Sequence, residues 1–154
     1  MSDQPVSNAR DESVDEGRLE EVRVLIVDDD RDVRESIEAA FQSEGALTLT
    51  AEDGDEAVRI CAEDPPDLVV LDMMLPKRSG FLALEKIKGT PDSPLVIMVT
   101  ANEGTRHRAY GESLGVDAYL LKPVPLGLLL DTACDLLDAL DDEEDEEDAR
   151  ADEG

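Results

Sequence analysis

Aspartate side chains stand at the ends of two apolar runs in this sequence. The first run ends in Asp28, Asp29 and Asp30, and the second ends in Asp72. If both runs are parallel strands of one sheet, their carboxyl ends meet at one edge, where open α/β sheets carry their ligands. Crowded carboxylates repel one another unless a cation is present, and Mg2+ prefers such oxygen ligands. The pattern therefore predicts a magnesium site that contains Asp28, Asp29 and Asp72.

Two further apolar runs end in groups that suit phosphoryl chemistry. Residues 95–99 lead into Thr100, which offers a hydroxyl, and residues 118–121 lead into Lys122, which offers a compact positive charge. An aspartate in such a site can attack phosphorus and form an acyl phosphate, while the metal and the lysine stabilise the transferring oxygens. The residue types therefore indicate a phosphoryl site centred on Asp72.

Alternating periodicities predict the elements that position these groups. Apolar, strand-like runs alternate with helical segments, and the central runs are apolar enough to be covered on both faces. Five such units in this order favour a doubly wound five-stranded parallel sheet of the α/β class. The expected strands are residues 22–27, 47–50, 68–71, 95–99 and 118–121, and the expected helices begin near residue 31 and span 53–62, 79–88, 104–114 and 125–140.

Four motifs resemble the receiver domain of two-component response regulators. They are VLIVDDD, PDLVVLDMMLP followed by Gly80, VTA, and DAYLLKP, and each lies at an expected strand end. The resemblance covers residues 21–140 and keeps the family's spacings between motifs. It implies the (βα)5 flavodoxin-like receiver fold. Because only 14 residues follow Leu140, we expect a stand-alone receiver without a DNA-binding or catalytic output domain.

The resemblance also implies a role for each matching residue. Asp72 would be the phosphoacceptor, and Mg2+ would be bound by Asp28, Asp29, Asp72 and the backbone carbonyl of Met74. Thr100 would donate a hydrogen bond to the phosphoryl group.

The remaining implied roles concern the lysine and the switch. Lys122 would form an ion pair with the phosphoryl group, and its peptide bond to Pro123 would be cis. Thr100 and Tyr119 would form the switch, the tyrosine turning inward when the threonine moves.

The same resemblance implies the partners and the reaction. A histidine kinase or a phosphotransfer protein would phosphorylate Asp72. The modified domain would contact a downstream protein through the face made by the fourth helix, the fifth strand and the fifth helix. The chain would not be an enzyme beyond catalysing its own phosphorylation and dephosphorylation.

The net charge disfavours one class of partner and suggests a habitat. The chain carries 40 acidic and 14 basic residues, a formal net charge of -26, and it has four lysines beside ten arginines. This balance disfavours direct, nonspecific binding to nucleic acid. An acidic, lysine-poor surface also suits molar salt, where self-repulsion is screened over about 3 Å, so a halophilic source is a hypothesis.

Both ends of the sequence are low in complexity. Residues 1–20 and 141–154 are acidic and lack an apolar face, so we expect two disordered extensions around a receiver at residues 21–140. No run is long and apolar enough to span a bilayer and no leader is evident, which predicts a cytoplasmic protein without membrane contact. Cys61 and Cys134 fit no metal-ligand spacing and are expected to be reduced.

Two other functions use the same residues. A Mg2+-dependent phosphohydrolase would act on an external substrate, but Asp72 is followed by Met73 and Met74 rather than by the DxD pattern of aspartate-nucleophile phosphatases, and no cap insertion is present. A receiver-like interaction module without phosphotransfer would not need the intact set of Asp28, Asp29, Asp72, Thr100 and Lys122.

Overall fold

A single parallel sheet organises the molecule. The computed structural model describes residues 17–75, 79–90, 92–101 and 105–153. Within these residues the sheet has the strand order β2-β1-β3-β4-β5, with every neighbouring pair parallel. The strands are β1 (Arg23–Val27), β2 (Leu47–Ala51), β3 (Leu68–Asp72), β4 (Leu95–Thr100) and β5 (Ala118–Leu121). The predicted doubly wound five-stranded parallel sheet is confirmed.

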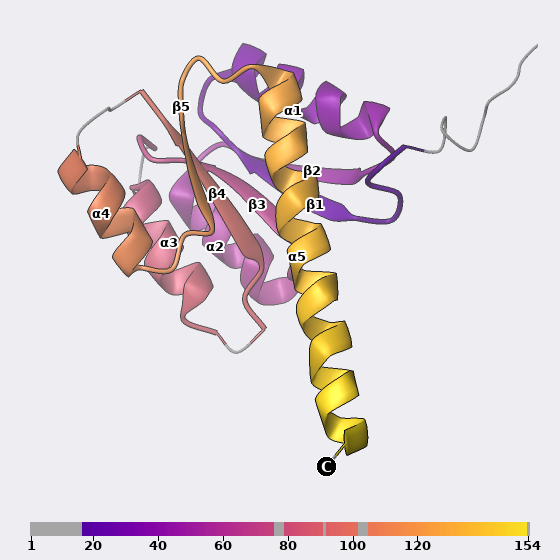
Figure 1. Ribbon diagram of the computed structural model, residues 1–154. Coiled ribbons are helices and arrows are strands. Elements are labelled where there is room, and N and C mark those ends of the chain that lie inside the picture. Colours follow the sequence, from indigo (N-terminus) through magenta and orange to yellow (C-terminus); the bar gives the residue numbers. More distant parts are fainter. Residues whose placement is uncertain (1–16, 76–78, 91, 102–104, 154) are drawn as a thin grey trace, which may run out of the picture.

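Helices cover both faces of this sheet (Figure 1). They are α1 (Arg31–Ser43), α2 (Gly54–Glu63), α3 (Gly80–Lys88), α4 (Thr105–Ser113) and α5 (Leu126–Glu153). One apolar core lies between the sheet and α1 with α5, and it contains Phe41 and Leu129. The other lies between the sheet and α2 with α3, and it contains Ala57, Leu84 and the ring of Tyr119. The alternation of side chains along each strand divides the two cores.

Local capping explains where three of the helices begin. The side chain of Asp30 accepts hydrogen bonds from the backbone N–H groups of Asp32 and Val33, and Asp53 accepts one from Glu56. Ser79 caps α3 in the same way. Because an N-cap oxygen satisfies an otherwise unpaired N–H group, these residues fix the helix starts beside the ends of β1, β2 and β3.

The structure differs from the sequence prediction at the amino-terminal side of β1. Residues 1–16 lie outside the described residues, but residues 17–20, predicted as part of a disordered extension, pack on the domain. Leu19 is 1% exposed and belongs to the core beneath α1 and α5. Its N–H donates to the carbonyl of Glu44 at 2.8 Å, and Arg18 pairs with Asp131 on α5. A single leucine among acidic residues has no periodicity, so the sequence pattern could not reveal this contact.

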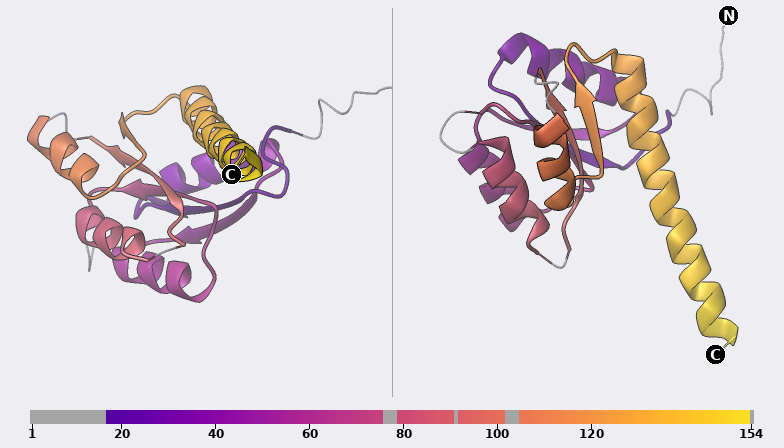
Figure 2. Two further views of the ribbon diagram at one scale, coloured as in Figure 1. Left: turned by 60° about the horizontal axis from the view of Figure 1, so that its bottom comes forward. Right: turned by 60° about the vertical axis from the view of Figure 1, so that its left-hand side comes forward.

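The structure also differs at the carboxyl-terminal side. We expected the last helix to end at Leu140 before a disordered tail, whereas α5 continues to Glu153 and extends beyond the sheet (Figure 2). The reason is local: residues 141–153 contain Glu, Ala, Asp and Arg but neither glycine nor proline, so no residue stops the helix.

Two further observations bear on the sequence predictions. Among the residues that the structure describes, no helix combines the length and the apolar character needed to cross a membrane. Cys61 and Cys134 are both free thiols, and burial raises the pKa of Cys61 to about 11. Cys61 is therefore an inert, protonated core residue at neutral pH.

Candidate functional site

Parallel pairing brings the predicted residues to one edge of the sheet. Val27 at the end of β1 pairs with Leu71 of β3, so Asp28 and Asp72 follow at the same level. Asp72 in turn pairs with Val99 of β4, which places Thr100 one residue beyond it. Asp28 is 2% exposed, Asp72 is 5% exposed and Thr100 is fully buried. The edge therefore holds polar side chains that are almost completely removed from water.

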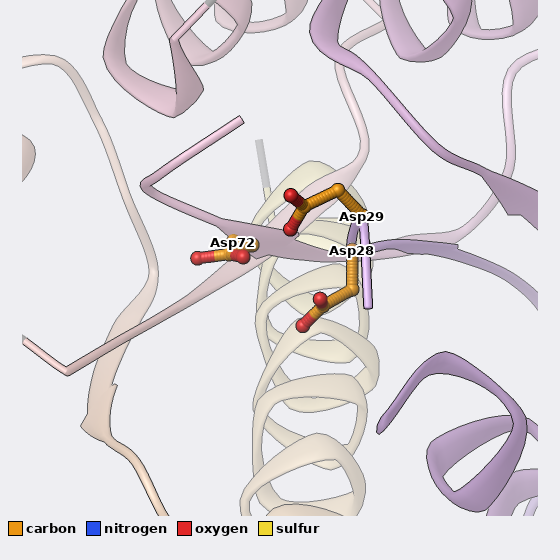
Figure 3. Close-up of side chains that lie close together, drawn as sticks. All are labelled: Asp28, Asp29 and Asp72. Atoms are coloured by element: carbon orange, nitrogen blue, oxygen red, sulfur yellow. The ribbon is translucent and has the colours of Figure 1, made fainter. Parts of the chain in front are cut away.

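Three carboxylates converge at this edge. Asp28, Asp29 and Asp72 each offer one oxygen, and these oxygens all lie within 4.8 Å of one another (Figure 3). Asp29 is exposed, whereas the other two are buried. A hard divalent ion with oxygen ligands fits this donor set, because it would offset repulsion between the buried carboxylates. The residues present therefore fit Mg2+.

Lys122 supplies the positive charge of the site. Its Nζ lies 2.9 Å from Oδ2 of Asp28 and 3.3 Å from Oδ2 of Asp72. Burial by itself lowers the pKa of Lys122, but the hydrogen bonds and charges of the two aspartates outweigh burial and raise it. The ammonium group is thus held in its charged form between two carboxylates.

Asp72 is not fully compensated by this lysine. Burial raises the pKa of Asp72, and the charge of Asp28 adds to that rise. The backbone N–H of Met74, which donates to Oδ1 of Asp72 at 3.1 Å, and the charge of Lys122 act in the opposite direction without cancelling the effect. Among the described residues, the charge of Lys122 stands against the three carboxylates of this cluster, an arrangement that favours a bound cation.

Backbone contacts set the loop that follows Asp72. The N–H of Gly80, at the start of α3, donates to the carbonyl of Met73 at 2.8 Å. A Cβ atom at Gly80 would lie 2.5 Å from Cα of Met73 and would also collide with the carbonyl oxygen of Asp72. Only glycine allows α3 to approach β3 this closely. Gly80, the glycine that follows the second motif, is therefore a structural part of the site.

The remaining strand ends are joined by a backbone hydrogen bond. The N–H of Lys122 donates to the carbonyl of Thr100 at 2.7 Å, and the Lys122–Pro123 bond is cis, as the resemblance implied. Thr100 and Lys122 therefore lie next to each other at the ends of neighbouring strands.

The carbonyl of Met74, expected as a metal ligand, belongs to an exposed residue directly after the buried Met73.

The ring of Tyr119, which the resemblance assigns to the switch, lies in the core. The resemblance implied that this ring turns inward when Thr100 moves, but the ring is already buried, with 6% of the residue exposed. Its hydroxyl lies 4.0 Å from Sδ of Met73, the residue after Asp72. The expected movement of this ring stays a prediction.

Two arginines belong to the surroundings of the site although the sequence pattern did not single them out for it. Arg34 donates from Nη1 to the carbonyl of Asp28 at 2.8 Å. Arg108 donates from Nη2 to the carbonyl of Tyr119 at 3.1 Å and lies over its ring. In the sequence both look like surface charges on helices, and nothing in their spacing links them to a strand end.

A comparison with protein-family models identifies the family of the domain that contains this site. The model of the response regulator receiver domain matches residues 24–133, which include all strand residues except Arg23 and the whole carboxylate cluster. The chain belongs to the response regulator receiver family. The receiver fold and the order of the four motifs agree with this membership.

Relatives and solved structures are consistent with it. The response regulator MprA of Mycolicibacterium vanbaalenii is 40% identical over 109 residues, which cover 71% of this chain and 47% of that protein. The MprA protein of Mycobacterium tuberculosis matches to the same extent. This receiver chain thus spans about half the length of the curated relatives it matches.

Two solved receiver structures show the same architecture. A CheY-like receiver domain from Methanospirillum hungatei superposes with a TM-score of 0.77 at 29% identity, covering 80% of this chain and 98% of the other. A chain of the CheX-CheY-BeF3-Mg+2 complex from Borrelia burgdorferi gives 0.71 at 28% identity, covering 75% and 89%.

Proposed function

We propose that this receiver accepts a phosphoryl group on Asp72 from a histidine kinase or a phosphotransfer protein, in a Mg2+-dependent reaction. One observation carries the proposal: Asp72 is buried at the sheet edge, beside Lys122 and within 4.8 Å of oxygens of Asp28 and Asp29. A carboxylate placed among a lysine and potential metal ligands suits attack on phosphorus rather than a structural role.

The step balances without any further reactant. A carboxylate oxygen of Asp72 forms the bond to phosphorus as the bond from phosphorus to the imidazole nitrogen of the donor breaks, and that nitrogen keeps the electron pair. Mg2+, when bound by Asp28, Asp29, Asp72 and the Met74 carbonyl, would neutralise charge on the transferring oxygens.

The residues of this chain account for binding and orientation. The Met74 N–H and the Lys122 ammonium hold the two oxygens of Asp72 in fixed directions. After transfer, Lys122 would pair with the phosphoryl group and the hydroxyl of Thr100 would donate to it, because hydrogen bonds to charged oxygens are the stronger ones. Water attack on the acyl phosphate would return the free carboxylate.

Signalling would follow from a change in these contacts. Lys122 and Thr100 stand at the ends of β5 and β4, which support α4 and α5, so a new pairing at the strand ends alters the face that α4, β5 and α5 share. A downstream protein that binds this face would then distinguish the two forms of the receiver, as a population shift requires.

The direct test is labelling of purified protein. Incubation with Mg2+ and a small acyl phosphate should add the mass of one phosphoryl group to the peptide that contains Asp72. Asp72→Asn should take up none, and Asp29→Ala should lose both labelling and Mg2+ binding. Asp138→Asn, an exposed position on α5, is the matched control and should label normally.

Each outcome separates the alternatives. Label that persists in Asp72→Asn places the nucleophile elsewhere. Steady release of phosphate from an external phosphomonoester would favour a phosphohydrolase. Absence of any label in the wild-type protein would leave an interaction module.

A further inference from the structure

The ring of Tyr119 lies between the loop after Asp72 and the helix α4. On one side its hydroxyl is 4.0 Å from Sδ of Met73. On the other side is Gly111 of α4, where an added Cβ atom would lie 3.6 Å from the ring, an ordinary contact distance. The side chain of Tyr119 therefore lies against Met73, the residue that follows Asp72 in the chain, and against α4 at the same time.

Arg108 makes two contacts with this same tyrosine. The centre of its guanidinium lies 5.4 Å from the centroid of the Tyr119 ring, within the range of a cation–π contact. Its Nη2 donates to the backbone carbonyl of Tyr119 at 3.1 Å. Figures 1 and 2 show α4 beside β5, the two elements that these contacts join. One planar, charged group thus holds both the ring and the main chain of one residue.

Arginine suits both contacts because its planar cation stacks on an aromatic face while its N–H groups reach a carbonyl. Lysine could provide the charge over the ring but has no planar fork. Only one partner is shielded from solvent: Tyr119 is 6% exposed and belongs to the core under α2 and α3, whereas Arg108 is exposed and covers the ring from outside.

We propose that Arg108 is a positioning residue that holds Tyr119 in its buried position and, through the contact of Tyr119 with Met73, couples α4 to the phosphoacceptor loop. This coupling rests on the proposed function of Asp72, whereas the positioning of the ring does not. Met73 lies between Asp72 and Met74, whose N–H orients the Asp72 carboxylate. A ring that is free to leave the core would release Met73 and loosen that orientation.

The positioning is tested by the exposure of the ring. The chain has two tyrosines and no tryptophan, so Tyr110→Phe leaves Tyr119 as the sole tyrosine fluorophore and keeps the ring that packs on Phe81. In this background Arg108→Ala should raise the acrylamide quenching constant about twofold or more, because a contact of this kind shifts an equilibrium by roughly two- to fivefold.

Two further variants keep the test decisive. Arg108→Lys, which retains the charge, should give an intermediate quenching constant and remains usable if Arg108→Ala does not fold. Arg59→Ala removes an exposed arginine of α2 that pairs with Glu63 and should leave quenching unchanged. Equal quenching in Tyr110→Phe protein with Arg108, Arg108→Ala or Arg108→Lys would overturn the positioning role.

The coupling is tested by the affinity for beryllofluoride in the presence of Mg2+, measured by calorimetry. Arg108→Ala should weaken binding roughly two- to fivefold, and it should have no further effect in a Tyr119→Leu background, since the ring transmits the contact. A merely structural loss would lower stability while leaving affinity unchanged, which contradicts the coupling. If wild-type protein binds no beryllofluoride, the proposed function and the coupling both fail, while the quenching result still decides the positioning.

Discussion

Replacing Asp72 by asparagine should stabilise the metal-free protein while abolishing phosphorylation. Asparagine keeps the shape and the acceptor oxygen for the Met74 N–H, but it removes one charge from a site with three carboxylates. The Lys122 ammonium would then serve Asp28 alone, at 2.9 Å. Function and stability are thus in conflict at this residue.

The magnitude follows from the distances. At an effective dielectric constant of about 20, the attraction between Lys122 and Asp72 at 3.3 Å is about 5 kcal/mol. Repulsion from each neighbouring carboxylate within 4.8 Å is at least about 3.5 kcal/mol at the same dielectric constant, so the two repulsions exceed the attraction. Because Asp29 is exposed and screened, we expect a gain of about 1 to 2 kcal/mol in the free energy of unfolding.

The gain should depend on pH in a defined direction. The pKa of Asp72 is raised in the folded protein by burial, so its contribution to stability is fully present below the unfolded pKa of about 3.9 and is lost as pH rises through the folded pKa. Asparagine does not titrate. The advantage of Asp72→Asn should therefore be small near pH 4 and larger at pH 7.

Urea unfolding followed by circular dichroism in EDTA measures both quantities. Adding Mg2+ at about ten times its dissociation constant should stabilise the wild type by about 1.4 kcal/mol and the variant by less. Asp138→Asn, which removes an exposed charge from α5, should show neither effect. A variant less stable than wild type at pH 7 in EDTA, or an advantage that grows as pH falls, would refute the reasoning.

Four further substitutions test the site and the packing around it. Without metal, Lys122→Met should lower the free energy of unfolding by about 2 kcal/mol, which is less than for a fully buried pair because the lysine side chain is 25% exposed. Mg2+ should restore part of this loss. An unchanged free energy of unfolding in urea would contradict the pairing of Lys122 with the two aspartates. Gly80→Ala should lower the free energy of unfolding by more than about 2 kcal/mol and reduce labelling of Asp72. At Gly111 an added Cβ atom would lie at an ordinary contact distance from its neighbours, so Gly111→Ala should stabilise α4 by roughly 0.5 to 1 kcal/mol in thermal unfolding. Leu19→Ala should cost about 2 to 3 kcal/mol, and a change near zero would mean that residues 17–20 do not pack on the core.

Much of the scaffold could be predicted because it depends on local pattern. Apolar runs defined the five strands to within one residue at every end, and the first helix begins at Arg31, as expected. Helix ends were less predictable, as α5 shows. A polar segment without glycine or proline is compatible both with a continuing helix and with a disordered tail. Propensity alone differs too little between the two outcomes.

By itself, the sequence determined which residues stand at strand ends: Asp28 and Asp29 after β1, Asp72 at the end of β3, and Thr100 and Lys122 after their own runs. Only the tertiary structure decided which of them touch. Lys122 meets Asp28 from 94 residues away and Asp72 from 50, because the strand order places β1 beside β3 and the carboxyl ends of the parallel strands meet at one edge. The burial of Leu19, the close approach at Gly80 and the contact of Arg108 with Tyr119 likewise depend on packing between distant segments, for which a local period carries no information.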